Sequence, residues 1–252
     1  PLAATEIRCS SGGRGTQSET VGSGDGGAYT VAGCKLIRDA LAAASSLGSD
    51  DMLAVIDDVL TSLNTSGSTG LHSAADTVAV RSSVASVLLD AARSAVTDPS
   101  TMVQYSQQMA RVTNEPSQLS SQGVDVALDF AELLVSLTET PTGPQLDATA
   151  SIASNILEKS VQYENSAYAA NITIDAAKVA ANRVVAVVHA LAGLVSRRTT
   201  IGGEPVAVSA PNLEIIAAKD TVQNMEGASL QGVDGGVSIP VGAFVQPDGH
   251  PM

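Results

Sequence analysis

Acidic side chains form the densest group of residues in this sequence that could perform catalysis or bind a metal. Asp50, Asp51, Asp57 and Asp58 lie close together. Paired carboxylates can act as general acid and base, or bind a divalent cation. They have no His and no Gly-rich ligand loop nearby, so helix capping and a solvated helix face explain them better. Asp234 could contribute to a calcium site, but Asp-Gly-Gly is typical of a tight turn.

A second motif with possible chemistry is glycine-rich. Gly22, Gly24 and Gly27 match the spacing G-x-G-x-x-G of dinucleotide-binding loops. That loop functions between a strand and the helix whose N-terminus binds the phosphates. Here the glycines follow a polar coil, and no parallel sheet can be recognised around them. A flexible Gly/Ser loop is the better interpretation, and we expect no cofactor.

The three histidines, His72, His189 and His250, do not indicate a metal site. None has Cys or Glu at metal-ligand spacing. His189 lies in an apolar stretch, where a hydrogen-bonded core residue is the expected interpretation. No G-x-S-x-G nucleophile elbow occurs either. We therefore assign no catalytic, cofactor-binding or metal-binding residue, and expect a protein that is not an enzyme.

Two cysteines and two glycosylation sequons favour an extracellular location. Cys9 and Cys34 would close a loop that stabilises the fold by about 3 kcal/mol in the chain-entropy model. The sequons begin at Asn64 and Asn171. In a reducing compartment the cysteines would instead be free thiols and the asparagines unmodified.

Composition excludes several classes of partner. The net charge of −13 disfavours nucleic acid and anionic membrane surfaces. Aromatic residues are only 2% of the chain, so Ala, Val, Leu and Ile must form the core, and an aromatic-lined ligand cavity is not expected. The longest apolar run, 184–195, is shorter than the roughly 20 residues of a membrane span, so we expect no membrane insertion. Because the chain starts at Pro1 without a signal peptide, we expect a processed segment of a larger protein whose anchor lies elsewhere.

Hydrophobic periodicity predicts a helical bundle after a Gly/Ser-rich arm. Residues 1–34 form the arm, which a disulfide could pin, and residues 35–200 form a helical domain with short connections and antiparallel neighbours. The expected helices cover 35–45, 49–63, 73–96, 100–113, 120–138, 145–163 and 174–196, and Asp98-Pro99 marks the start of the fourth. The fifth has the clearest 3.6-residue period, with an apolar stripe of Val124, Ala127, Leu128, Ala131 and Val135. The helix 174–196 is apolar nearly all round, which predicts a position at the centre of the bundle. Arg197 and Arg198 could form a dibasic cleavage site, but cations at a helix C-terminus explain them better.

The hydrophobic period changes from helical to alternating after Gly203. Residues 201–252 therefore predict the start of a strand-rich domain, with Val206 and Val208 on one face of a strand. Prolines border that strand and Pro240 lies within a later one, which indicates edge strands. The fold class is mainly α: a multi-helix antiparallel bundle followed by a small β-layer, α+β overall.

This order of elements resembles the GAIN domain of polycystin-1/REJ-like receptors and adhesion receptors. The resemblance rests on the helix series, on Val206-Ala-Val-Ser-Ala-Pro-Asn-Leu213, and on Val237-Ser-Ile-Pro240. It implies a helical subdomain and the first strands of a β-sandwich that carries an autoproteolysis site in the family. This sequence has no Trp and no Cys after Cys34, so no self-cleavage residue is assigned.

The resemblance implies an extracellular structural or interaction module of a large polycystin-1-like, cell-surface or ciliary protein. Its partners would be other chains or other domains of the same protein, and a polycystin-2-type channel is one candidate. The Ala/Ser/Gly/Val-rich composition suits a GC-rich genome, such as that of a green alga. With the resemblance, this would fit a ciliary-surface or mastigoneme-type assembly. The alternative is a cytoplasmic, Ala-rich, vinculin-like adhesion bundle, which predicts free thiols, unused sequons and no packed β-layer. An enzyme would need a polar cluster in a cleft, which the sequence does not reveal.

Overall fold

The computed structural model describes residues 41, 44, 47–66, 74–95, 98–137, 142–170, 174–225, 227–232 and 236–238 of the 252-residue chain. Within these ranges the fold is mainly helical, and a small antiparallel β-layer follows the helices. The predicted fold class is therefore confirmed. The principal helices are α2 (Ser49–Ser66), α3 (Ala74–Ser94), α4 (Pro99–Thr113), α5 (Ser121–Leu137), α6 (Gly143–Ala170) and α7 (Ile174–Arg198).

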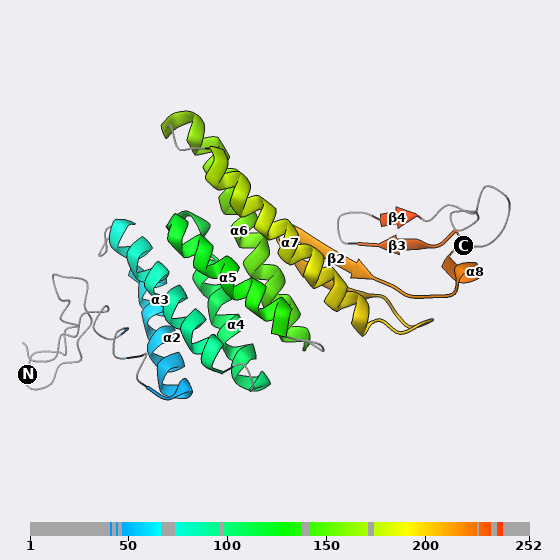
Figure 1. The fold of residues 1–252 in the computed structure, drawn as a ribbon, viewed down its shortest axis with the longest axis horizontal. Coiled ribbons are helices and arrows are strands. Elements are labelled where there is room, and N and C mark those ends of the chain that lie inside the picture. Colours follow the sequence, from blue (N-terminus) through cyan, green and yellow to red (C-terminus); the bar gives the residue numbers. More distant parts are fainter. Residues whose placement is uncertain are drawn as a thin grey trace, which may run out of the picture.

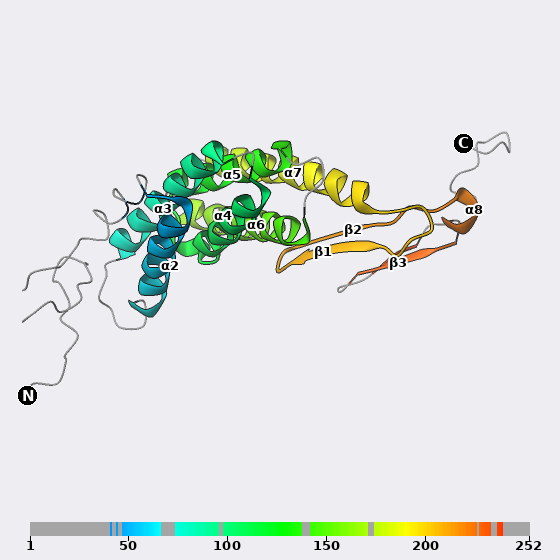
Figure 2. The ribbon, with the colours of Figure 1, turned by 90° about the horizontal axis from the view of Figure 1, so that it is seen from below.

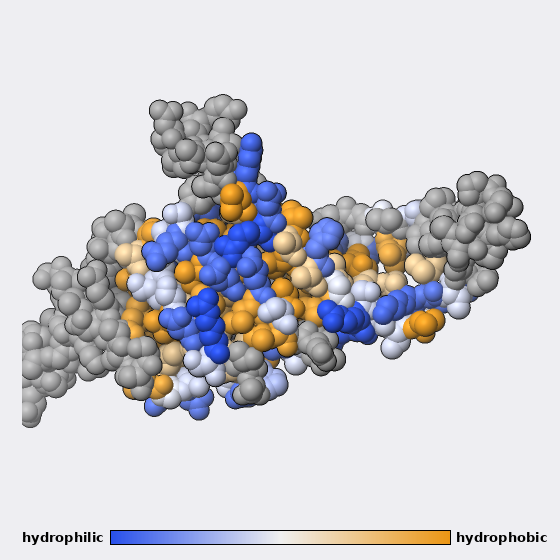
Figure 3. All heavy atoms as spheres, viewed as in Figure 1, coloured by the Kyte–Doolittle hydropathy of each residue, from blue (hydrophilic) through white to orange (hydrophobic). Residues whose placement is uncertain are grey.

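The helices form two layers. Helices α3, α5 and α7 lie side by side in one layer, and α2, α4 and α6 form the other, as Figure 1 and Figure 2 show from two directions. A short 3-10 helix, η1 (Pro116–Gln118), connects α4 to α5 across the layers. We call the layer of α3, α5 and α7 the outer layer and the layer of α2, α4 and α6 the inner layer. The outer layer has one long solvent-facing side, which Figure 3 shows face on.

Local sequence signals determine where several helices begin. The carboxylate of Asp98 accepts hydrogen bonds from the backbone N–H groups of Ser100 and Thr101, and Pro99 occupies the first helical position of α4. Thr142 and Gln145 exchange hydrogen bonds around the start of α6, which is the reciprocal capping box. The predicted helices from residue 49 onwards agree with α2 to α7 except near their ends: α2 continues to Ser66, and α6 continues to Ala170. The predicted arm 1–34 and helix 35–45 lie outside the described residues, apart from Leu41 and Ala44.

The main core lies between the two helical layers. It is built mainly from aliphatic side chains, as the aromatic-poor composition predicts, together with three methionines and two aromatic residues, Tyr105 and Phe130. Four members of the predicted α5 stripe, Val124, Ala127, Leu128 and Ala131, are buried, and the fifth, Val135, is partly buried against the core. A core of this kind stabilises by apolar area removed from water and by close packing of the two layers.

Helix α7 is not at the centre of the bundle, so that prediction is wrong. It ends the outer layer, packing against α5, α6 and the β-layer on one side only. Val179 and Val185 are 57% and 56% exposed, and His189 is exposed rather than buried in the core. Because apolar residues lie on nearly all sides of α7, the sequence did not indicate which side is buried or that half of the helix faces solvent.

Two β-hairpins follow the helices. β1 (Val206–Ala210) pairs antiparallel with β2 (Leu213–Ala217), and β3 (Ser229–Gln231) pairs with β4 (Gly236–Ser238). A four-residue helix, α8 (Val222–Met225), lies between the hairpins. The alternation in residues 206–209 predicted β1 and its buried face, whereas β2 and β3 were not predicted as separate strands.

The first hairpin packs on the bundle. Val208 and Ile215 are directly paired and bury their side chains with Leu146 of α6 and with Leu191 and Leu194 of α7. In Figure 2 the hairpin extends the layer of α6 and lies beneath the C-terminal half of α7. Two strands are marginal in water alone, so this second core is what holds the β1–β2 hairpin in place.

Candidate functional site

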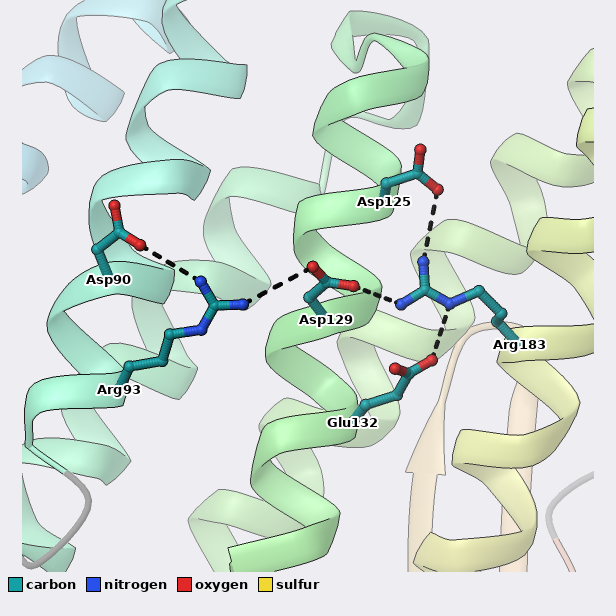
Figure 4. A network of polar contacts seen from close by, with 6 residues as sticks. All are labelled: Asp90, Arg93, Asp125, Asp129, Glu132 and Arg183. Carbon is teal, nitrogen blue, oxygen red and sulfur yellow. Dashed lines mark hydrogen bonds and ion pairs between the residues drawn. The ribbon is translucent and has the colours of Figure 1, made fainter.

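The most extensive polar cluster in the described residues joins the three helices of the outer layer. Arg183 of α7 donates to Glu132 at 2.8 Å, to Asp129 at 2.6 Å and to Asp125 at 3.5 Å. The three acids lie at positions i, i+4 and i+7 of α5, so they share one helix face. Figure 4 shows the guanidinium of Arg183 among all three carboxylates.

Arg93 extends the cluster to α3. Its guanidinium lies 3.5 Å from a carboxylate oxygen of Asp90 and 3.9 Å from one of Asp129. Asp129 is therefore shared between the arginines of two neighbouring helices (Figure 4). In Figure 3 hydrophilic residues form a blue band over this face, with hydrophobic residues on both sides.

The charges of this cluster are arranged to hold helices together and are unsuited to acid–base catalysis. The hydrogen bond that Arg183 donates to Glu132 is the largest influence on its guanidinium and raises its pKa, so the arginine stays charged. General acid–base work needs a group that can change protonation near neutral pH, and an arginine held by carboxylates cannot. The cluster is a set of ion pairs that joins α3, α5 and α7.

A second polar cluster is buried between α3 and the end of α4. Arg81 is fully buried; it donates to Gln118 at 2.8 Å and to the backbone carbonyls of Val112 at 3.1 Å and Arg111 at 3.3 Å. Burial lowers the pKa of Arg81, and the charge of Glu115 opposes that effect. The guanidinium satisfies carbonyls that the end of α4 leaves without helical partners, which fixes η1 against α3.

A third contact joins α2 to α4 in the inner layer. Arg111 forms an ion pair with Asp57 and donates a second hydrogen bond to Gln108. The hydrogen bond from Arg111 is the largest cause of a lowered pKa at Asp57. Asp50, Asp51 and Asp58 are exposed, as the prediction of a solvated helix face requires, while Asp57 has this further role.

The β1–β2 hairpin is anchored to α6 by polar contacts at its turn. The backbone N–H of Asn212 donates to the hydroxyl oxygen of Ser154 at 2.9 Å, and the Asn212 amide donates to the Ser154 carbonyl at 3.5 Å. Ser154 is fully buried. The turn of the Val206–Leu213 motif therefore makes a specific contact with the helical bundle.

Several residues singled out from the sequence lie outside the described part of the chain. They are Cys9, Cys34, Gly22, Gly24, Gly27, His72, Asn171, Asp234 and His250. The backbone of Asn64 is described and lies in the last turn of α2. Arg197 and Arg198 are exposed in the last turn of α7, as predicted, where cations interact favourably with the negative end of the helix dipole.

The sequence did not reveal the residues that form the observed clusters. Arg81, Ser154 and Arg183 belong to no motif, and each pairs with a residue at least 30 positions away. Asn212 lies in the Val206–Leu213 motif, but the sequence did not indicate its partner on α6. The i, i+4, i+7 spacing of Asp125, Asp129 and Glu132 was the only available signal. Among the described residues no group of His, Cys, Asp and Glu could hold a metal ion, and no buried side-chain nitrogen or oxygen lacks a hydrogen-bond partner.

Comparisons of the chain with protein-family models, with curated proteins and with solved structures found no match.

One helix in the described residues has the length and composition of a membrane span. It covers Lys178–Arg198 of α7, and a third of it is buried within the fold. This span is longer than the uninterrupted apolar run 184–195, because it includes polar residues on both sides of that run. Core helices of soluble proteins share this length and composition, so the feature is weak support for a membrane location.

Proposed function

We propose that the chain is a non-enzymatic, extracellular structural module that acts through protein–protein contacts. The order of its parts supports the proposal: a helical bundle precedes a β-hairpin, and Ser154 and Asn212 join the two. This is the order expected of a module similar to the GAIN domain of polycystin-1-like proteins. A cell-surface or ciliary protein would be its setting, and other domains or a polycystin-2-type channel its partners.

The polar clusters also support a structural role. Arg81, Arg111 and Arg183 each connect one helix to another, and the carboxylates near them are engaged in ion pairs or hydrogen bonds. An active site differs in having groups poised to change protonation or attack a substrate. The arrangement of these charged groups is that of contacts that hold a fold together.

The packed hairpin favours this proposal over the cytoplasmic, vinculin-like alternative, which predicts no packed β-layer. Val208 and Ile215 bury their side chains against α6 and α7, so β1 and β2 are part of the fold. The two proposals also differ in covalent chemistry, which provides a direct test.

The test is intact and peptide mass spectrometry of natively purified protein without reduction. We expect a Cys9–Cys34 disulfide and glycan on Asn64 or Asn171. The variants Cys34→Ser, Asn64→Gln and Asn171→Gln should each remove only the matching mass. Free thiols and unmodified asparagines on a complete peptide map would contradict the extracellular proposal and favour the cytoplasmic bundle.

A further inference from the structure

The solvent-facing side of α7 lacks Asp, Glu, Lys and Arg over about 21 Å, which is the rise of the fourteen steps from residue 179 to residue 193. We call the exposed residues of this segment the α7 stripe. They are Val179, Asn182, Val185, Ala186, His189 and Gly193. Val179 and Val185 are more than half exposed. An uncharged helix face of this length is unusual for a surface that only meets water.

Gly193 is a second anomaly of the same face. Glycine destabilises a helix interior relative to alanine, yet a Cβ at residue 193 would meet no atom within 4 Å. Packing within the described chain therefore does not require this glycine. Close approach of another helix would require a small residue here, because small residues let two backbones come near.

The charges around the α7 stripe are arranged in two opposite groups. Lys178, Arg197 and Arg198 are exposed at the ends of the stripe, and none of the three has an ion pair within the described residues. Beside the stripe, on α5, Asp125 remains 64% exposed although it contacts Arg183. Arg197 donates a 3.4 Å hydrogen bond to the backbone carbonyl of Gly193, which leaves its charge without a carboxylate partner. One face of the molecule thus carries cations without ion pairs at the end of α7 and an accessible carboxylate on α5.

We propose that the α7 stripe binds a second copy of this chain, with the two α7 helices antiparallel across a twofold axis. This dimer rests on the proposed function, in which the chain acts through protein–protein contacts, and it would be one of those contacts. A twofold interface must be self-complementary, and a face with both signs of charge beside an uncharged stripe meets that requirement.

Helix geometry shows how the charges would meet. Helices α5 and α7 run in the same direction because α6 connects them, and Arg183 lies level with Asp129. An axis midway between Ala186 and Ala190 places Arg197 of one copy level with residue 179 of the other. Asp125 lies one helical turn before Asp129 and is therefore at that level.

The position of Lys178 is compatible with this pairing. Lys178 lies five positions before Arg183, which places the two side chains about 140° apart around α7. Arg183 faces α5, so Lys178 lies on the other edge of the stripe. Arg197 of the second copy then lies between α7 and α5 of the first copy, nearer to Asp125 of the first copy than to its Lys178. A parallel pair would instead place Arg197 beside Arg197 with no carboxylate opposite.

Sedimentation velocity on the full chain, from micromolar to hundred-micromolar concentration, tests the proposal. We expect a species of twice the 25.4 kDa mass of one chain. Val185→Asp places a charge in the stripe and should weaken association at least about tenfold. Leu47→Asp changes an exposed leucine beside α2, away from α7, and should leave the association constant unchanged.

A charge exchange separates a lost interface from a damaged fold. Arg197→Glu and Asp125→Arg should each weaken the dimer, and the double variant should recover it, which misfolding would not allow. A monomer at every concentration, a dimer indifferent to Val185→Asp, or the absence of recovery would overturn the proposal. So would a monomer that binds vesicles of phosphatidylcholine and phosphatidylserine through the stripe. None of these outcomes affects the disulfide and glycan masses that test the proposed function.

Discussion

The backbone N–H of Asn212, in the turn of the β1–β2 hairpin, donates a 2.9 Å hydrogen bond to the hydroxyl oxygen of Ser154 on α6. These two residues join the strands to the helical bundle at a fully buried serine. The apolar contacts of Val208 and Ile215 hold the face of the hairpin, whereas this hydrogen bond fixes its turn. Five predictions follow from contacts of this kind.

Ser154→Ala should destabilise the protein and loosen the hairpin. It leaves a backbone N–H without its acceptor, at a cost of about 1–3 kcal/mol in the free energy of unfolding. Urea denaturation measures the loss, and hydrogen exchange should show faster exchange in β1 and β2. Ser151→Ala, on a partly exposed serine of the same helix whose hydroxyl bonds to the carbonyl of Asp147, is the matched control and should change little. Equal effects of the two variants would contradict an anchoring role for Ser154.

Arg81→Met should be strongly destabilising. The substitution leaves Gln118 and the carbonyls of Arg111 and Val112 without their buried donor, for a loss of at least about 2 kcal/mol. Arg81→Lys should recover only part of it, because an ammonium cannot reproduce the planar fork. The control is Arg93→Met on the same helix, whose side chain is 55% exposed, with a loss below about 1 kcal/mol. Thermal denaturation distinguishes these results.

Gly123→Ala should cost stability, whereas Gly193→Ala should increase it. A Cβ at residue 123 would lie 2.9 Å from the Ser82 hydroxyl, which is itself held by Ser120 at 2.7 Å. Relief of that clash must either rotate the Ser82 hydroxyl away from its hydrogen bonds to Val78 and Ser120 or separate α3 from α5, at a cost of about 1–3 kcal/mol. Residue 193 has open space, so alanine gains about 1 kcal/mol from helix propensity. Both changes can be read from urea midpoints, and a neutral Gly123→Ala would disprove the close approach.

The contribution of Asp98 to stability should depend on pH. Hydrogen bonds from the hydroxyls of Thr101 and Ser100 and from their backbone N–H groups lower the pKa of Asp98 from 3.8 to about 2. The folded state therefore favours the carboxylate, and this stabilisation is present above pH 4 and disappears as the pH falls through about 2. Melting temperatures of wild type and Asp98→Ala should differ above pH 4 and converge near pH 2. A constant difference across that range would show that the carboxylate charge does not contribute.

Arg183 and Glu132 should show a measurable coupling energy. In a double-mutant cycle of Arg183→Gln and Glu132→Gln, we expect about 0.5–1 kcal/mol, since their side chains are 24% and 43% exposed. The coupling should decrease in 1 M NaCl because salt screens partly exposed charges. A coupling near zero at low salt would mean that the pair does not stabilise the contact between α5 and α7. Asp57 and Arg111 provide a comparison pair between α2 and α4.

The sequence alone determined helices α2 to α7, strand β1 and the fold class. The 3.6-residue periodicity of α5 predicted the stripe Val124, Ala127, Leu128, Ala131 and Val135; the first four are buried and Val135 is partly buried. The Asp98-Pro99 pair predicted the start of α4, because capping and a fixed φ are local effects. Such signals act within a few residues, so they can be read without the rest of the protein.

The tertiary structure decided the position of α7 and the partners of the buried polar groups. A helix that is apolar all round has no preferred face, so only packing against α5, α6 and the hairpin fixed which half of it faces solvent and left His189 exposed. The burial of Arg81 and the contact between Ser154 and Asn212 likewise depend on residues far apart in the chain. The free energy of a buried hydrogen bond depends on its partner and on the exclusion of water, and neither is encoded in local sequence.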